Sequence, residues 1–201
     1  MGPGAGVYVP SLAELFERVT VSDIEPAYLD DIRPLCARYG NVEPVADDIT
    51  RTTLSAAGFD VILCSEVIEH IADSRAALRG MQRLLRSGGI LILSTPQRYS
   101  SLEVAAKIAF LPGIISLVRL IYREPVFEMG HINLMTEREV RRQLAEAGFR
   151  IREAHKTGLY VPVLAEFGGT AAQRLEAWLE QRLRGGPLDG LLWTQNYVAG
   201  G

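Results

Sequence analysis

The stretch Gly2-Pro3-Gly4-Ala5-Gly6, followed by Asp23 at the end of an apolar, β-branched run, decides the fold of this chain. Three alternating glycines let the backbone turn tightly and approach a ligand with no Cβ in the way. A helix that begins at such a loop points its free N–H groups at the same ligand. An acid at the end of the next strand is placed to accept both hydroxyls of a ribose. The stretch therefore predicts a nucleoside-binding site.

The glycine spacing indicates which nucleoside is bound. A dinucleotide fingerprint, which cradles a pyrophosphate, needs a further glycine where Val7 stands. Gly-x-Gly-x-Gly without it resembles motif I of the class I S-adenosylmethionine-dependent methyltransferases, whose cofactor carries no phosphate. The resemblance implies that Gly2, Gly4 and Gly6 wrap the methionine and sugar portion of S-adenosylmethionine. It also implies that Asp23 accepts the ribose hydroxyls, with Ile24 as the next cofactor contact.

The rest of the chain alternates between strand patterns and helix patterns. Strands are expected at 19–22, 42–46, 59–64, 90–93, 150–155 and 191–198, and helices at 7–18, 28–39, 74–86, 136–147 and 171–184. We expect the second helix to break or kink at Pro34 and the third to stop at Gly88-Gly89. Thr136 and Glu139 have the spacing of a capping box. This alternation is typical of an α/β fold with a mostly parallel sheet between helices.

Two further blocks strengthen the resemblance. Gly-Phe-Asp-Val-Ile-Leu-Cys-Ser-Glu-Val-Ile-Glu-His at 58–70 and Arg-Ser-Gly-Gly-Ile-Leu-Ile-Leu-Ser-Thr-Pro at 86–96 are similar to strands 4 and 5 of the class I methyltransferases. Residues 130–136 and 144–149 resemble the element before strand 6, and 193–199 resembles strand 7. The resemblance implies a Rossmann-like, doubly wound, mostly parallel sheet whose last strand is antiparallel.

One family element is absent from the printed sequence. In the family, an apolar strand that ends in an acid precedes the glycine loop and forms the centre of the sheet, whereas this sequence starts at Met1. Without that strand two neighbours keep unpaired backbone groups, and each buried unsatisfied group costs about 1–3 kcal/mol. We therefore expect Met1 to be an internal residue of a longer protein, in the apolar position just before Gly2.

The resemblance assigns further cofactor contacts. Asp48, after the expected strand 42–46, would accept from the adenine amino group, with Ile49 beside the ring. Asp47 competes with Asp48 for this role, and the sequence does not decide between them. Ser65 follows the strand at 59–64, at the carboxyl edge where open α/β sheets bind ligands.

Glu66, Glu69 and His70 have the spacing i, i+3 and i+4, which one helical turn would place on one face. Two carboxylates and an imidazole suit a divalent metal such as Mg²⁺, and His131 could complete the set. The pattern resembles two metal-using groups, the small-RNA 3′-end 2′-O-methyltransferases and the ubiquinone-pathway O-methyltransferases. Two alternatives stay open. In one, His70 acts directly as a base or positioning group beside Glu66, since imidazoles titrate near neutral pH. In the other, the three residues are structural.

Composition limits the remaining choices. With 201 residues the chain fits a single domain, and a formal charge of −3 gives no sign of a nucleic-acid partner. Two cysteines are too few for a disulfide framework, so a reduced, cytoplasmic location fits best. Residues 104–122, inside an insert at about 100–129, are apolar, but Lys107, Pro112-Gly113 and Arg119 interrupt them, so no transmembrane helix is expected. We expect helices there that cover the active site, with contact to a membrane surface as the alternative.

These observations favour an enzyme that transfers the methyl group of S-adenosylmethionine to a small molecule, apolar or lipid-like, with oxygen favoured over nitrogen or carbon as the accepting atom. His70 and Glu66 are the candidate catalytic residues. A first alternative is a non-catalytic or truncated methyltransferase-like fold that serves as an interaction module. A second is a nicotinamide-dependent oxidoreductase, which Val7 disfavours. The methyl acceptor and the oligomeric state stay open.

Overall fold

The computed structural model describes residues 1–109, 132–159, 161 and 168–201, and its described strands form two sheets. The small sheet pairs β1 (Val19–Asp23) in parallel with β2 (Val42–Ala46). The large sheet has the order β3-β4-β6-β5. Its strands are β3 (Phe59–Ser65), β4 (Leu85–Pro96), β5 (Arg150–Thr157) and β6 (Thr194–Gly200). Strand β3 runs parallel to β4, while β6 is antiparallel to β4 and β5.

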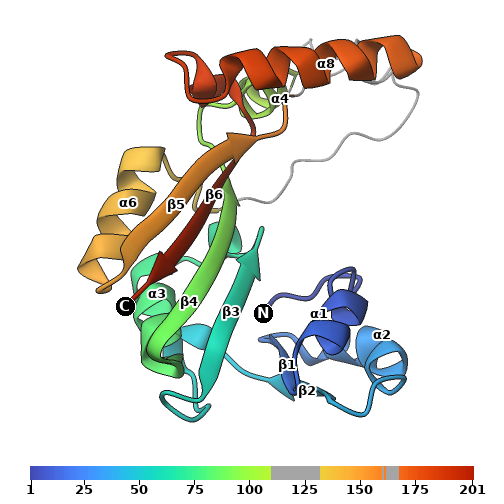
Figure 1. The fold of residues 1–201 in the computed structure, drawn as a ribbon, viewed down its shortest axis with the longest axis vertical. Coiled ribbons are helices and arrows are strands. Elements are labelled where there is room, and N and C mark those ends of the chain that lie inside the picture. The colour runs from blue at the N-terminus through green and yellow to red at the C-terminus, as the bar shows by residue number, and fades with distance from the viewer. Residues whose placement is uncertain (110–131, 160, 162–167) are drawn as a thin grey trace.

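The predicted α/β class and the antiparallel last strand are therefore confirmed. Among the described strands, the small sheet and the large sheet are not hydrogen-bonded to each other. Figure 1 shows the amino end of the chain between β3 and the small sheet.

The main core lies between the large sheet and two helices, α3 (Ser74–Leu84) and α6 (Glu137–Glu146). Alternate residues of β4, Leu91 and Leu93, are fully buried, as expected for a strand with side chains on opposite faces. Helix α3 buries one apolar stripe against the sheet, made of Ala77, Leu78, Met81 and Leu84.

A second, smaller core belongs to the small sheet. Helices α1 (Val9–Leu15) and α2 (Pro26–Cys36) pack with β1 and bury Val9, Val21, Leu29, Ile32 and Cys36. This core and the main core are separate clusters of buried residues. The amino-terminal part of the chain thus has its own packing.

Two local expectations differ from the structure in part. Helix α2 is not broken at Pro34 but ends soon after it, at Cys36. Helix α3 ends at Leu84, before the glycines, because Leu85 already pairs with Phe59. Gly88 and Gly89 instead lie inside β4. The register with β3 shifts there, and Gly88 adopts φ +77°.

The capping box was predicted correctly. The Thr136 hydroxyl accepts from the Glu139 N–H at 3.3 Å, and the Glu139 carboxylate accepts from the Thr136 N–H at 2.8 Å. These two bonds give acceptors to backbone N–H groups that would otherwise have none in the first turn of α6.

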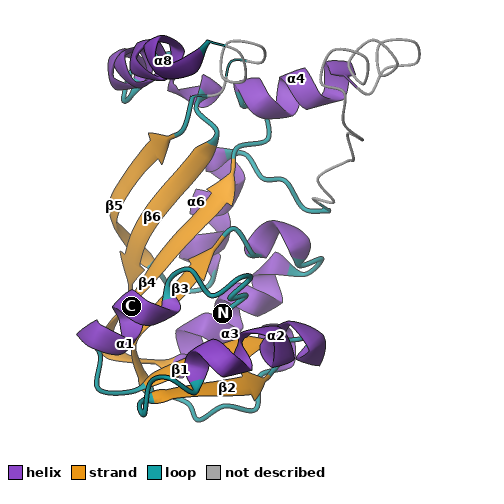
Figure 2. Cartoon of the chain, turned by 90° about the vertical axis from the view of Figure 1, so that its right-hand side faces the viewer, coloured by secondary structure: helices purple, strands orange, loops and turns teal. Residues whose placement is uncertain are grey.

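The insert is described only in part. Helix α4 (Ser101–Ala109) begins it, and residues 110–131 lie outside the described residues. Figures 1 and 2 both place α4 and α8 (Gly169–Leu183) beyond the same end of the large sheet. Among the described helices none is long and apolar enough to cross a membrane. The single-domain organisation stays a prediction.

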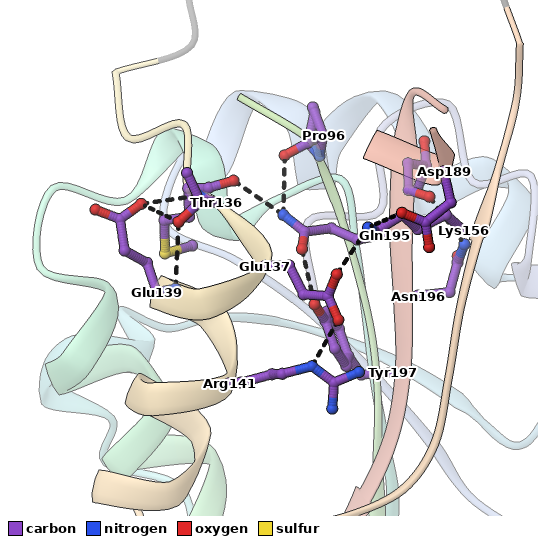
Figure 3. Close-up of polar contacts among 12 residues, drawn as sticks. Pro96, Thr136, Glu137, Glu139, Arg141, Lys156, Asp189, Gln195, Asn196 and Tyr197 are labelled. Atoms are coloured by element: carbon purple, nitrogen blue, oxygen red, sulfur yellow. Dashed lines mark hydrogen bonds and ion pairs between the residues drawn. The ribbon is translucent and has the colours of Figure 1, made fainter. Parts of the chain in front are cut away.

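Buried polar groups join the far edge of the large sheet to α6. Lys156, only 8% exposed, places its Nζ 2.7 Å from Glu137 Oε2 and 2.8 Å from Asp189 Oδ1. The Tyr197 hydroxyl donates to Gln195 Oε1 at 2.7 Å, and Gln195 Nε2 donates to the Met135 carbonyl at 2.9 Å. Figure 3 shows these contacts between α6 and the strands.

Candidate functional site

The glycine loop begins between the carboxyl ends of β1 and β3. Gly2 N donates to the Ser22 carbonyl at 2.9 Å, and Met1 N donates to the Leu63 carbonyl at 3.0 Å. These two bonds hold the start of the loop beside both strands. Gly4 and Gly6 follow, and the φ angles of Gly2, Gly4 and Gly6 are +58°, +50° and +75°. All three residues therefore adopt the left-handed region, which residues with a Cβ rarely occupy.

The three glycines differ in what surrounds them. A Cβ on Gly2 would lie 2.3 Å from Val67 Cγ2, and one on Gly6 would lie 2.7 Å from Leu35 Cδ2. A Cβ on Gly4 would meet nothing within 4 Å. Gly2 and Gly6 thus allow close packing inside the protein, whereas Gly4 turns its backbone toward open space. A loop of this shape is a cradle that a ligand can approach closely.

Asp23 lies at the end of β1, directly after the residue that anchors the loop. Its Oδ1 accepts from the Glu25 N–H at 2.9 Å, which fixes the direction of the carboxylate. The side chain of Ile24 next to it is 68% exposed. The structure thus brings Asp23 and Ile24 together with Gly2 at one edge of the small sheet, as the sequence analysis expected of a cofactor site.

Asp48 and Asp47 both bond to their own loop. Asp48 Oδ1 accepts from the Thr50 N–H at 2.9 Å and from the Thr50 hydroxyl at 2.7 Å, and Asp48 Oδ2 pairs with Arg51 at 3.2 Å. These hydrogen bonds, those from Thr50 first, lower the pKa of Asp48 below its usual value. Asp47 Oδ1 accepts from the Thr53 N–H at 3.1 Å. Both acids are therefore fixed on this loop, and the choice between them for an adenine contact stays a prediction.

Ile49 is 6% exposed and belongs to the main core, so it offers a ligand little surface. Gly80 of α3 explains this position, because a Cβ there would lie 2.2 Å from the Ile49 carbonyl oxygen. A glycine within a helix pattern is the sequence signal of such a close approach. Gly80 is a positioning residue that the sequence reasoning missed.

Ser65 and Glu66 lie where β3 ends. The hydroxyl oxygens of Ser65 and Ser94 are 2.9 Å apart, so Ser65 joins β3 to β4 at the carboxyl edge. Glu66 N donates to the Ser94 carbonyl at 3.0 Å, and Glu66 has φ +54°. A left-handed conformation at a residue other than glycine costs of order 1–3 kcal/mol and is concentrated at functional sites.

The turn after β3 is not the helical turn that the sequence analysis expected to place Glu66, Glu69 and His70 on one face. Only Ile68–His70 forms a short 3₁₀ turn, and the left-handed Glu66 precedes it. Glu69 is fully buried, whereas the side chain of His70 is 48% exposed, so the two residues differ in their access to solvent although their side chains are neighbours. The reason is tertiary: Glu69 Oε2 accepts from the Thr95 hydroxyl at 3.1 Å, which draws it beneath the sheet edge.

Burial raises the pKa of Glu69 to about 7. Its Oε1 accepts no hydrogen bond from the described residues and lies 3.9 Å from His70 Nε2. The Glu69 carbonyl accepts from the N–H groups of Ile132 and Asn133 at 3.1 and 2.9 Å. Asn133 Nδ2 also donates to the Ile71 carbonyl at 3.0 Å. Thr95 and Asn133, which the sequence reasoning missed, therefore hold the turn that carries His70.

The predicted metal site is not assembled by the described part of the chain. Within residues 1–109, 132–159, 161 and 168–201, no three His, Cys, Asp or Glu side chains could hold a metal ion together. His131, the fourth predicted ligand, lies outside the described residues.

Comparison with known proteins places this geometry in a family. A model of the methyltransferase domain matches residues 1–154. A probable S-adenosylmethionine-dependent methyltransferase of Mycolicibacterium smegmatis is 27% identical over 192 residues, which cover 94% of this chain and 65% of that protein. A ubiquinone biosynthesis O-methyltransferase of Cereibacter sphaeroides is 36% identical over 103 residues, 49% of this chain and 40% of that protein. The chain thus spans less than two thirds of the length of either relative.

Solved structures share the fold. An S-adenosylmethionine-dependent methyltransferase from Mesorhizobium loti superposes with a TM-score of 0.65 at 14% identity, over 99% of this chain and 88% of that one. One from Aquifex aeolicus gives 0.60 at 14% identity, over 98% and 78%. The family model covers most of the chain, from the glycine loop to β5. The chain therefore belongs to the methyltransferase domain family and has its Rossmann-like fold.

Proposed function

We propose that this methyltransferase-family protein binds S-adenosylmethionine at the glycine loop and transfers its methyl group to an oxygen of a small-molecule acceptor. The observation that carries the proposal is the Gly2 N–Ser22 O hydrogen bond of 2.9 Å. It places a left-handed glycine cradle, open at Gly4, directly beside Asp23. The named relatives support a cofactor of this kind, and those named ubiquinone biosynthesis O-methyltransferases support oxygen as the accepting atom.

The residues present fit this cofactor. The backbone of Gly2, Gly4 and Gly6 would surround its methionine and sugar part, and Asp23 would accept the ribose hydroxyls. Exposed Ile24 supplies apolar surface next to that acid. Asp48 with Ile49, and Ser65 at the end of β3, complete the proposed set. When bound, the cofactor supplies a sulfonium methyl group that is already activated for transfer.

The protein then has to align the acceptor and remove its proton. Alignment of two reactants lowers the activation barrier by about 7–11 kcal/mol. A general base raises the rate by about 10²–10⁴-fold. We assign the base to His70, because its imidazole is half exposed at the turn that follows β3. Glu66, at the strand end, would orient the acceptor. Glu69 is fully buried, so we assign it to positioning of His70.

Calorimetric titration with S-adenosylmethionine tests the cofactor site. Loss of a charge-assisted hydrogen bond costs about 1.5–3 kcal/mol, so Asp23→Asn should weaken binding by about tenfold or more. Asp30→Asn is the matched control, because Asp30 lies on α2, is largely exposed and pairs with Arg33. Absence of binding to the unmodified protein, or equal affinities for the two variants, would contradict the proposal.

Transfer of a labelled methyl group tests the chemistry. Acceptors that bear hydroxyl, amine or thiol groups are compared, and hydroxyl compounds should be labelled. His70→Gln should lower kcat by about 10²-fold or more while the dissociation constant of S-adenosylmethionine stays unchanged. A loss in cofactor affinity of the same size would instead place His70 in the binding site. Addition of Mg²⁺ after treatment with a chelator tests the predicted metal, which would restore rate only if it holds the acceptor.

The second candidate is a non-catalytic interaction module. The separation of the two sheets favours it, since the small sheet carries the cofactor loop and lacks a strand partner on its β1 side among the described strands. The titration distinguishes the two candidates. The proposed enzyme should bind S-adenosylmethionine with an affinity that depends on Asp23, whereas an interaction module does not need to bind it.

A further inference from the structure

The carboxyl end of β4 carries one more pair of residues beyond the ladder of the large sheet. Pro96 and Thr194 form the last row of β4 and β6, and the next N–H along, that of Gln97, donates to the Trp193 carbonyl at 2.6 Å. Residues directly opposite each other in an antiparallel pair point to the same face of the sheet, with about 5 Å between their Cβ atoms. The side chains of Gln97 and Trp193 are therefore neighbours at the end of the sheet.

The rows before this pair have polar side chains that bond to protein groups. Side chains alternate between the two faces along a strand, so Thr95 and the opposite residue Gln195 share the face of Gln97. The Thr95 hydroxyl donates to Glu69 Oε2 at 3.1 Å, and Gln195 Oε1 accepts from the Tyr197 hydroxyl at 2.7 Å. Both residues thus have partners within the protein.

The outer row is different, because it carries one unused acceptor and one unused donor. Gln97 is 7% exposed, and its buried Oε1 accepts no hydrogen bond from the described residues. Trp193 Nε1 is also buried and has no acceptor among the described residues. Buried polar groups nearly always have a partner. The two atoms therefore indicate a ligand group that the described part of the chain does not supply.

A hydroxyl group fits both atoms. It carries one donor and two acceptor lone pairs, so it can donate to Gln97 Oε1 and accept from Trp193 Nε1 at the same time. A carboxylate lacks the donor that Gln97 Oε1 needs, and an ammonium group lacks the acceptor that Trp193 Nε1 needs. The pair therefore selects a neutral hydroxyl over either charged group.

The pair lies near the turn that carries His70. Two residues along a strand span about 7 Å, so the Cα atoms of Gln97 and Thr95 are about that far apart. Thr95 bonds to Glu69, whose Oε1 lies 3.9 Å from His70 Nε2. One small molecule can therefore extend from His70 to Gln97.

Apolar side chains lie at the same end of the sheet. Helix α4 begins at Ser101, four residues after Gln97, and Figures 1 and 2 place it beyond this end. It exposes Val104 and Ile108, which lie one turn apart on one helix face. An apolar body suits a ligand in these surroundings better than a second charge does.

We propose that Gln97 and Trp193 bind a neutral hydroxyl group of the methyl acceptor, separate from the oxygen that His70 would deprotonate. The inference rests on the proposed function and narrows its substrate class to uncharged, largely apolar molecules that bear two hydroxyl groups. Gln97 and Trp193 determine specificity, because an acceptor without the second hydroxyl leaves both atoms without a partner.

Magnetic resonance of the Trp193 indole N–H tests the site with phenol and toluene, two rings of similar size that differ in one hydroxyl. The chain has two tryptophans, and Trp178 on α8 is 51% exposed, so its signal is the internal reference. Phenol should shift the Trp193 signal in a saturable way and leave that of Trp178 in place. Toluene should bind about fivefold more weakly or less, because it can use neither atom.

Three results would overturn the proposal. Phenol leaves the Trp193 signal unchanged, or toluene saturates the shift at the same concentration as phenol. In the third, a bound water contacts the Trp193 N–H and phenol does not displace it. These comparisons use the unmodified chain, so they hold even if a variant does not fold.

Gln97→Leu should weaken phenol binding by about fivefold or more. Gln82→Leu is the matched control, because Gln82 Oε1 is likewise buried without a hydrogen bond from the described residues. Gln82 lies against Gly148 and Gly201, at the opposite end of the sheet, so this variant should bind phenol like the unmodified protein. Equal losses in the two variants would contradict a direct contact with Gln97.

Phenol binding needs no cofactor, so this inference and the proposed function can fail separately. Methyl transfer by a protein whose Trp193 signal ignores phenol would overturn the hydroxyl site alone. A phenol-dependent shift in a protein that transfers no methyl group would overturn the proposed function and keep the hydroxyl site.

Discussion

The large sheet and the small sheet are both built from apolar strands with helices packed against them, yet different interactions stabilise them. Four strands of the large sheet share one core with α3 and α6, and Lys156 and Gln195 add buried polar contacts at its far edge. Within the described part of the chain, the small sheet shares its core with α1 and α2, and Asn41 bonds at 2.8 Å to the carbonyls of Ala13 in α1 and of Phe16 directly after it. The half that carries the glycine loop and Asp23 is therefore the less strongly supported half.

The largest test of this difference compares matched leucines. Leu93 is fully buried in β4 and Leu29 is 3% exposed in α2. We expect Leu93→Ala to lower the free energy of unfolding by about 3–5 kcal/mol and Leu29→Ala by about 2–3 kcal/mol, because a small core with an open side relaxes around the gap more easily. Urea unfolding measures both. A larger loss for Leu29→Ala would reverse the comparison.

Glu69 tests how the turn next to the site is supported. Burial raises its pKa from 4.5 in a model compound to about 7. A carboxyl that binds its proton more tightly when folded stabilises the fold fully below about pH 4.5, and this contribution is lost as pH rises through about 7. At about 1.4 kcal/mol per pKa unit, the loss is about 3–4 kcal/mol.

Glu69→Gln should remove that part of the pH dependence, since an amide keeps the hydrogen bond from Thr95 without a charge. Unfolding free energies between pH 4.5 and pH 8 measure it. Glu14→Gln is the control, because Glu14 is exposed on α1, and its profile should follow the unmodified protein. A Glu69→Gln profile that keeps the full slope would show that Glu69 is not the titrating group.

Lys156 tests the polar edge of the large sheet. Lys156→Met leaves Glu137 and Asp189 without their shared cation, and we expect a loss of about 2 kcal/mol, because both carboxylates keep contact with water. Arg33→Met, which breaks an exposed pair on the small half, should cost less than about 0.5 kcal/mol. Thermal and urea unfolding report both changes. Equal small losses would mean that the buried network adds nothing to the large sheet.

Gly80 tests the joint between the two halves, where α3 meets the turn after β2. A Cβ at Gly80 would lie 2.2 Å from the Ile49 carbonyl oxygen, so Gly80→Ala should cost about 1–2 kcal/mol despite the better helix propensity of alanine. Gly40→Ala, where a Cβ meets nothing within 4 Å, should be neutral or slightly stabilising. Stability at or above that of the unmodified protein for Gly80→Ala would show that α3 can move away from Ile49 without loss.

The sequence correctly predicted the features that depend on residues close to one another along the chain. Strand Val42–Ala46 has the expected bounds, and the capping box of Thr136 and Glu139 forms as its spacing indicates. The glycine loop also has the left-handed angles that its composition predicts. In each case residues within a few positions along the chain supply the interaction.

The sequence failed where distant segments decide the environment. Spacing alone places Glu69 and His70 on one face, but Thr95, twenty-six residues further on than Glu69, draws Glu69 into the interior. The pattern Gly88-Gly89 predicts the end of a helix, but the pairing of β4 with β3 places both glycines where the strand register shifts. Nothing in the sequence indicated that Ile49 packs against Gly80 in the core.

The sequence by itself determined the α/β alternation, the turns and the residues available at the strand ends, because backbone preference and apolar periodicity act over a few residues. Only the tertiary structure decided which of those residues are accessible and how the strands divide into sheets. Burial and hydrogen bonding depend on groups that arrive from far along the chain, as the Met1–Leu63 and Glu69–Thr95 contacts do. For that reason the exposed His70 and the buried Glu69 became visible only in the folded protein.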